Sequence, residues 1–214
     1  VILIGHGEHE EVTGTMGEVP EMLLVESVAD AERVEVDDPS RVSYLTQTTL
    51  SVSETDQIIA ALRRRFPLLR GPAADDICYA TSNRQAALVD IAAEADLVLV
   101  VGSGNSSNSR RLVEVAVDAG AAAHLIEDVG DILPDWLDGA ATVGLTAGAS
   151  APPHLVDTVV EHLAALGPVT VEERQVVEEN VQFTLPLEVR RLTSPPPDAT
   201  DASCGRRASS PPRR

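Results

Sequence analysis

Short apolar runs alternate with amphipathic stretches from the first residue of the chain to about residue 166. The continuous runs predict buried strands over residues 1–4, 22–25, 42–45, 97–101, 122–126 and 141–145. The stretches between them repeat apolar residues at helical spacing, which predicts helices over residues 28–34, 54–66, 83–95, 111–119, 132–137 and 153–166. Strands that alternate with helices through short connections are typical of parallel sheets covered by helices. The expected fold class is therefore α/β.

Breaks in this alternation indicate how the chain is divided. The stretch LRGPAADD at residues 69–76 interrupts the periodicity, so we predict one α/β domain over residues 1–74 and another over residues 75–175. An extended segment is expected over residues 176–192. Residues 193–214 are rich in Pro, Ser and Arg and have almost no apolar side chains, which predicts a disordered tail.

Three polar loops follow predicted strands and precede predicted helices: TQTTLS at residues 46–51, GSGNSSNS at 102–109 and TAGASAPP at 146–153. In an open parallel sheet such loops gather at the carboxyl ends of the strands, where ligands bind. Helix N-termini there present unpaired N–H groups and could hold a phosphate without lysine. The alternative is that Ser and Asn serve only as helix caps and turn formers.

The polar stretch GHGEHEEVTGTMG at residues 5–17 contains candidate acid–base groups and is expected to be a loop. Extended backbone would place the side chains of His9 and Glu11 on the same side, where they could act as a proton relay. An ordinary solvated loop is the alternative. A metal site of His6, His9 and Glu11 is a further alternative, although the segment lacks the i, i+4 histidine spacing of zinc hydrolases.

The two cysteines lie in different contexts, so no disulfide framework is expected. Cys78 precedes a predicted helix, whose N-terminus would favour the thiolate. The alternative is an inert buried cysteine. Cys204 lies in the predicted disordered tail.

Charge and length exclude some classes of partner. The chain of 214 residues has a formal net charge of −18, which argues against nucleic acid and anionic membranes as partners. No apolar run approaches the roughly 20 residues of a membrane span, and no signal peptide is visible, so a cytoplasmic location is expected.

Five motifs together carry a resemblance: ILIGHGEHEEVTGTMG, YLTQTTLS, DDICYATSNRQ, VVGSGNSSNSRRL and GLTAGASAP. In this order and at these separations, they are similar to the LytB family of 4-hydroxy-3-methylbut-2-enyl diphosphate reductases. The resemblance implies a trefoil of three small α/β domains around a 4Fe–4S cluster. It also implies the final step of the methylerythritol phosphate route, in which the substrate's allylic hydroxyl leaves as water and isopentenyl and dimethylallyl diphosphates form.

The resemblance implies roles for individual residues. Glu11 would relay protons with help from His9, Thr48 would hold the substrate hydroxyl, and Cys78 would be a thiolate ligand of the cluster. The residues implied in diphosphate binding are His9, Ser106, Ser107, Asn108 and Ser150. The implied partners are the allylic diphosphate and an electron donor such as flavodoxin or ferredoxin.

The chain also departs from the family pattern. It starts at VILIGHG, whereas the family's other cluster cysteines and one of its domains belong to a preceding segment, and Cys204 is a poor substitute ligand. We therefore interpret the chain as the C-terminal two-thirds of such a reductase and expect it to be inactive and to bind no stable cluster alone. The alternative is a non-catalytic diphosphate-binding or interaction protein that retains the loops.

Overall fold

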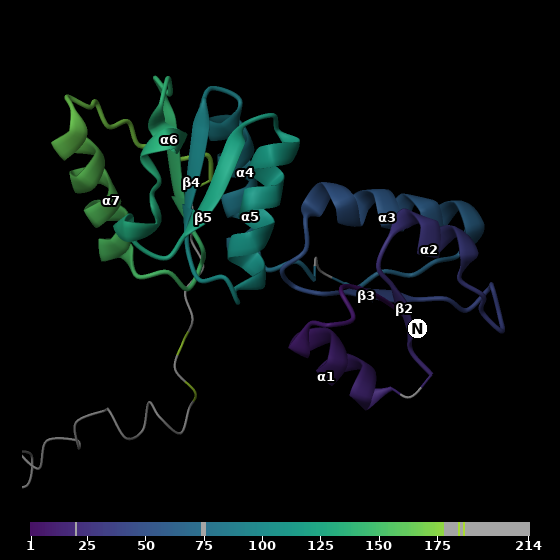
Figure 1. Cartoon of the computed structure of the whole chain (residues 1–214). Coiled ribbons are helices and arrows are strands. Elements are labelled where there is room, and N and C mark those ends of the chain that lie inside the picture. Colours follow the sequence, from purple (N-terminus) through teal and green to yellow (C-terminus); the bar gives the residue numbers. More distant parts are fainter. Residues whose placement is uncertain (20, 74–75, 178–183, 185, 187–214) are drawn as a thin grey trace, which may run out of the picture. The chain divides into compact units, whose positions relative to one another are not determined.

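The computed structural model describes residues 1–19, 21–73, 76–177, 184 and 186. Residues Val1–Val177 form one compact unit that contains two three-stranded parallel sheets (Figure 1). The α/β class with parallel sheets is confirmed. The predicted boundary near residues 69–76 stays a prediction, and most of the predicted extended segment and all of the predicted tail lie outside the described residues.

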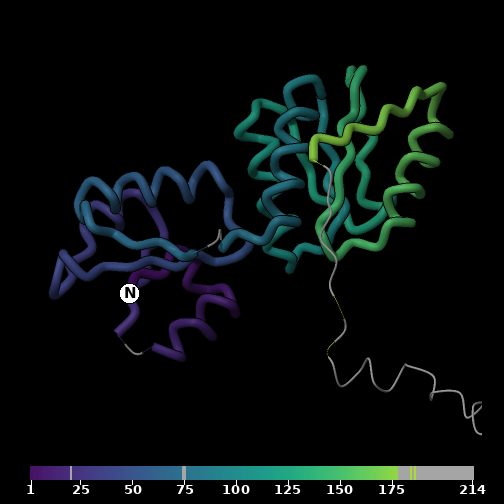
Figure 2. Tube along the Cα trace, turned by 180° about the vertical axis from the view of Figure 1, so that it is seen from behind, coloured from purple at the N-terminus to yellow at the C-terminus, as the bar shows by residue number. Residues whose placement is uncertain are grey.

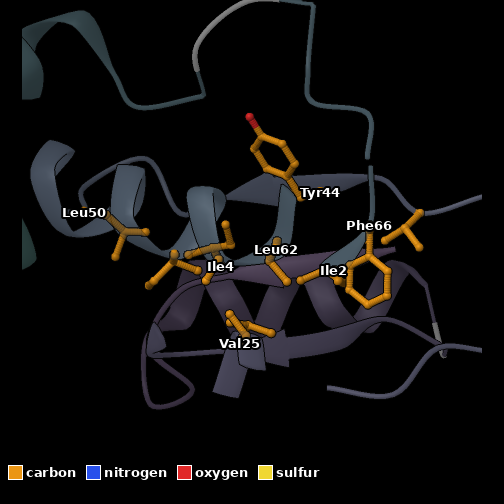
Figure 3. Packing of buried hydrophobic residues seen from close by; sticks show 11 residues of the cluster. Ile2, Ile4, Val25, Tyr44, Leu50, Leu62 and Phe66 are labelled. Atoms are coloured by element: carbon orange, nitrogen blue, oxygen red, sulfur yellow. The ribbon is translucent and has the colours of Figure 1, made fainter. Parts of the chain in front are cut away.

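The first sheet has the strand order β2-β1-β3. Central strand β1 is buried on both faces, because Ile2 and Ile4 point to one side and Leu3 to the other. Helices α2 and α3 cover the Ile2 side, where Leu62 and Phe66 pack (Figure 3), and α1 covers the Leu3 side. The elements are β1 (Ile2–Ile4), α1 (Glu10–Glu18), β2 (Leu23–Val25), α2 (Val28–Arg33), β3 (Tyr44–Thr46) and α3 (Val52–Arg65).

The second sheet has the order β5-β4-β6 and the same layered arrangement (Figure 2). On central strand β4, Val98 and Val100 pack under α4 and α5, while Leu97 and Leu99 pack under α7. The elements are α4 (Tyr79–Ala92), β4 (Leu97–Val101), α5 (Ser107–Asp118), β5 (Ala122–Ile126), the 3-10 turn η1 (Val129–Asp131), α6 (Pro134–Leu137), β6 (Val143–Ala147) and α7 (Pro153–Leu166). None of the helices in the described ranges is long and apolar enough to cross a membrane.

Helix starts differ more from the prediction than strands do. Helix α4 begins at Tyr79 instead of residue 83, and α5 begins at Ser107 instead of residue 111. Apolar periodicity marks the face of a helix that is buried, whereas the first turn here is polar and follows an N-cap residue. Ser107 therefore lies in a helix and not in the loop to which the sequence assigned it.

The expectation of a loop over residues 5–17 is wrong for its second half, which forms α1. His9 is the N-cap residue of this helix, and its side chain accepts a hydrogen bond from the Glu11 N–H. The acidic residues of the first turn, Glu10 and Glu11, suit the positive end of the helix dipole. A capping histidine was not recognised in the sequence because Ser, Thr, Asp and Asn are the usual N-cap residues.

Candidate functional site

The polar loops lie at the carboxyl ends of the strands, as predicted, and two of them touch. After β3, the Thr49 hydroxyl lies 2.9 Å from the Ser107 hydroxyl, and the Gln47 amide donates to the same hydroxyl oxygen at 3.3 Å. The loop after β6 reaches the end of β4, because the Gly148 N–H donates to the Val101 carbonyl at 2.8 Å. The candidate site is thus built from loops of both sheets.

Thr48 connects two of the predicted chemical groups. Its N–H and its hydroxyl donate to the two carboxylate oxygens of Glu11, at 2.9 Å and 3.0 Å. Its carbonyl oxygen accepts a hydrogen bond from the Cys78 N–H at 3.0 Å. The structure therefore brings Glu11 and Cys78, which lie far apart in the sequence, into hydrogen bonds with one threonine.

The pairing of His9 with Glu11 has a different geometry from the one predicted. The two residues do not share one side of an extended strand, since Glu11 lies in the first turn of α1. His9 Nδ1 accepts from the Glu11 backbone N–H at 3.2 Å. The carboxylate of Glu11 is therefore free of the imidazole and is bound by Thr48 instead.

Cys78 is a free and exposed cysteine in the N-cap position of α4, where no side chain caps the helix. The reading of Cys78 as an inert buried residue is wrong. An exposed thiol is accessible to a metal ion or another reactant. Its role as a metal ligand stays a prediction.

The first turn of α5 holds the serine and asparagine side chains that were predicted to bind an anion. Ser106 is the N-cap residue, and its hydroxyl accepts from the Ser109 N–H at 3.3 Å. Asn108 is 7% exposed, and among the described residues neither its amide nitrogen nor its amide oxygen has a hydrogen-bond partner. Leaving buried polar atoms unpaired costs about 1–3 kcal/mol each, so both atoms are available to a ligand.

Ser150 is exposed in the loop after β6. Its convergence with Ser106 and Asn108 on one cavity stays a prediction. The alternative metal site of His6, His9 and Glu11 is not formed, since within the described ranges no three His, Cys, Asp or Glu side chains could hold a metal ion together. Instead, His6 Nε2 lies 2.5 Å from a guanidinium nitrogen of Arg111.

Sequence reasoning missed three residues of the site. Gln47, 1% exposed, accepts from the His6 N–H at 3.0 Å and donates to Thr49 at 3.0 Å, which fixes the loop after β3. Ser109, also 1% exposed, lies beneath Ser106. Gln47 could have been found from the sequence, because it is a polar residue that directly follows a predicted strand. For Arg111, which also forms an ion pair with Glu54 at 3.0 Å, no signal was available because its partners are remote in the sequence.

Comparison with known proteins agrees with the motifs. Residues 1–164 match the protein family described as LytB protein. The chain belongs to the LytB family. The resemblance inferred from the five motifs is thereby confirmed.

Among the LytB relatives of this chain, the 4-hydroxy-3-methylbut-2-enyl diphosphate reductase of Acidothermus cellulolyticus is 58% identical over 193 residues, which are 89% of this chain and 57% of that protein. Reductase 1 of Mycobacterium tuberculosis is 51% identical over 191 residues, 89% of this chain and 58% of that protein. The solved E-1-hydroxy-2-methyl-but-2-enyl-4-diphosphate reductase of Plasmodium falciparum superposes with a TM-score of 0.82 at 34% identity, over 89% of this chain and 61% of that one. The chain thus spans about three-fifths of the length of these relatives.

Proposed function

We propose that this LytB-family chain takes part in the reductive dehydroxylation of 4-hydroxy-3-methylbut-2-enyl diphosphate to isopentenyl and dimethylallyl diphosphates. The observation that carries the proposal is the contact of one threonine, Thr48, with both Glu11 and Cys78. Thr48 is hydrogen-bonded to the Glu11 carboxylate and to the Cys78 backbone N–H, which supports a role for the three residues in one site. The reductase names of the relatives support the same activity.

The diphosphate end of the substrate is assigned to the first turn of α5 and the loop after β6. Ser106, Ser107 and Ser150 would donate hydroxyl protons to phosphate oxygens, and Asn108 would donate its amide N–H. The N-terminal end of α5 adds backbone dipoles of the favourable sign. Neutral donors suffice here because several of them share the charge of the diphosphate. His9, at the start of α1, is assigned to the same ligand.

The reacting end is assigned to Glu11 and Thr48. The reaction consumes two electrons and two protons: the allylic C–O bond breaks, one proton leaves with the hydroxyl group as water, and the other proton ends on carbon. Thr48 would hold the departing hydroxyl group, and the Glu11 carboxyl group would deliver protons to it. His9 supports the relay by fixing the backbone of Glu11 through its Nδ1 atom.

The LytB family uses a 4Fe–4S cluster, and Cys78 fits one position of its ligand set. It is a free, exposed cysteine at the N-cap position of α4, and cysteine is the residue that holds iron–sulfur clusters. When bound, the cluster would supply the electrons, which flavodoxin or ferredoxin would deliver. No other cysteine lies in the part of the chain that the structure describes, and the expectation that these 214 residues alone bind no stable cluster stays a prediction.

A second candidate function is diphosphate binding without turnover. The observation in its favour is that the residues assigned to the diphosphate lie in the described part of the chain, whereas Cys78 is the single free cysteine there. Both functions predict that the chain binds the diphosphate. Only the first predicts that bound substrate is converted to product, so a turnover assay distinguishes them.

Isothermal titration with 4-hydroxy-3-methylbut-2-enyl diphosphate tests the binding assignment. Turnover after anaerobic reconstitution of a protein that joins this chain to the cysteine-bearing family domain expected to precede it tests the reaction. Asn108→Ala is expected to weaken binding by about tenfold or more, because it removes a hydrogen bond to a charged group. Asn105→Ala is the matched control, since Asn105 is exposed in the same region and contacts only Ser103 within the described residues. Equal affinity of the Asn108 variant and the unmodified chain would contradict the binding assignment. Binding without turnover would favour the second function.

A further inference from the structure

Ser109 lies beneath the candidate diphosphate site, between two glycines. Gly102 directly follows β4 and Gly148 directly follows β6, the neighbouring strand. A Cβ atom at either glycine would come within 2.2 Å of the Ser109 hydroxyl oxygen, and one at Gly102 would also lie 2.7 Å from the Ser109 Cβ. The absence of side chains at both positions lets the first turn of α5 approach the edge of the sheet.

The buried Ser109 side chain has a polar partner above it. Its hydroxyl donates to the Ser106 hydroxyl oxygen at 3.0 Å, and its backbone N–H donates to the same atom at 3.3 Å. Ser106 Oγ therefore accepts two hydrogen bonds from one residue. Its own proton has no acceptor in the part of the chain that the structure describes.

This pattern fixes the direction in which Ser106 can donate. A serine hydroxyl has one proton and two acceptor lone pairs, and it normally rotates to suit its surroundings. With both lone pairs occupied by Ser109, the Ser106 proton is left pointing away from the helix. Two residues further along the chain, both buried amide atoms of Asn108 lack a partner within the described ranges.

We infer that Ser109 is a positioning residue: it orients the Ser106 hydroxyl as a donor to an anionic ligand, and the two glycines make room for it. The inference rests on the proposed diphosphate site and adds how one of its donors is oriented. Ser109 is 1% exposed, so it acts through Ser106 and not by contact with the ligand.

The test is a double-mutant cycle in which inorganic pyrophosphate is titrated into the full chain and its Ser106→Ala, Ser109→Ala and doubly substituted variants. Ser106→Ala is expected to raise the Kd by about tenfold, because it removes a donor to a charged group. Ser109→Ala is expected to raise it by about threefold to fivefold, because the Ser106 proton is then free to rotate. In the Ser106→Ala background, Ser109→Ala is expected to change nothing further, because residues that act through one another are not additive.

Folding of each variant is checked by thermal unfolding. Ser109→Ala removes only the hydroxyl oxygen, keeps the backbone N–H that donates to the Ser106 hydroxyl oxygen and adds no atoms between the glycines. A general structural role of Ser109 would give losses that add to those of Ser106→Ala. Two outcomes would overturn this inference alone. One is additive losses of pyrophosphate affinity. The other is wild-type affinity of the Ser109 variant when the Ser106 variant binds more weakly. Wild-type affinity of Ser106→Ala, or no pyrophosphate binding by the unmodified chain, would overturn the diphosphate assignment as well.

Discussion

At the scale of single residues, the site depends on which groups are already hydrogen-bonded and which are not. Glu11 is held by both of its carboxylate oxygens, so its position is fixed without burial. Asn108 is in the opposite state: it is buried, and no described residue forms a hydrogen bond with either of its amide atoms. The first arrangement suits proton transfer from a fixed point, and the second suits ligand binding.

In a protein that joins this chain to the cysteine-bearing family domain expected to precede it, replacing Glu11 by Gln is expected to lower turnover by about 100-fold or more, because general acid–base catalysis contributes about that much. Substrate affinity is expected to change by less than about threefold, since Glu11 is assigned to the reacting end only. Turnover and titration calorimetry measure the two effects. Glu10→Gln is the matched control, because Glu10 lies in the same helical turn and is exposed. Turnover of the Glu11 variant within threefold of the unmodified protein would contradict its role.

The sequence predicted residue types at the site better than residue environments. Cys78 was expected at a helix N-terminus and lies there, and Glu11 was singled out although its backbone is helical instead of extended. The burial of Asn108 and Gln47 could not be predicted, because it depends on packing between segments remote in the sequence. Local patterns report which groups a loop offers, whereas their hydrogen-bond partners depend on the tertiary structure.

At the scale of elements, the strands were predictable, whereas the starts of α4 and α5 were not. A buried parallel strand is a continuous apolar run, which the sequence displays directly. The start of α5 depends instead on the Ser106 cap and on two glycines that belong to different strand ends. A dependence on residues of other elements leaves no pattern in the neighbouring sequence, so the start of α5 could not be predicted from it.

Gly102→Ala is expected to destabilise the protein by about 1–3 kcal/mol, because the added methyl group overpacks the contact with Ser109. Urea unfolding can be followed by the fluorescence of Trp136, the sole tryptophan, which stacks on His124 at 3.8 Å between ring centroids. Gly104→Ala is the matched control, since nothing lies within 4 Å of a Cβ atom built there. Equal unfolding midpoints for the two variants would show that the approach of α5 is not close-packed.

Helix α2 carries a pH-dependent cap. The Ser27 hydroxyl donates to the Asp30 carboxylate at 2.7 Å, and this hydrogen bond lowers the pKa of Asp30 below its ordinary value of 3.8. A carboxyl group with a lowered pKa in the folded state stabilises the fold above pH 3.8, and the contribution is lost as the pH falls through the folded-state pKa.

Asp30→Asn is expected to remove this small contribution at neutral pH and to flatten the acid limb of the stability profile. Urea unfolding followed by circular dichroism between pH 6 and about pH 2 measures it, with the exposed Asp56→Asn as control. A profile unchanged by Asp30→Asn would contradict the cap's contribution.

At the scale of the whole molecule, polar side chains connect elements of the two sheets. Gln85 of α4 donates to the Leu50 carbonyl at 2.8 Å and accepts from the Val52 N–H at 2.9 Å, so it completes the start of α3. Arg111 of α5 pairs with Glu54 of α3. Because the loops of the candidate site belong to both sheets, these contacts help to hold Thr48 and Ser107 in fixed positions relative to each other.

Gln85→Leu is expected to destabilise the chain by about 2–4 kcal/mol, because it leaves a buried N–H and a carbonyl group of the Leu50–Val52 turn without partners. Chemical unfolding measured by circular dichroism gives the free energy. Gln57→Leu on the exposed side of α3 is the matched control and is expected to change stability by less than about 0.5 kcal/mol. Equal stability of the two variants would show that the Gln85 contacts contribute nothing to the fold.

The packing of Ser109 between Gly102 and Gly148 also limits how this protein can change over generations. A side chain at either glycine meets the Ser109 hydroxyl oxygen at 2.2 Å, so it can be accepted only after residue 109 has lost that atom. Losing that atom first, however, frees the Ser106 proton. The three positions are therefore expected to vary together or not at all among descendants that keep an anion site. A lineage in which both glycines have acquired side chains has abandoned this way of orienting Ser106.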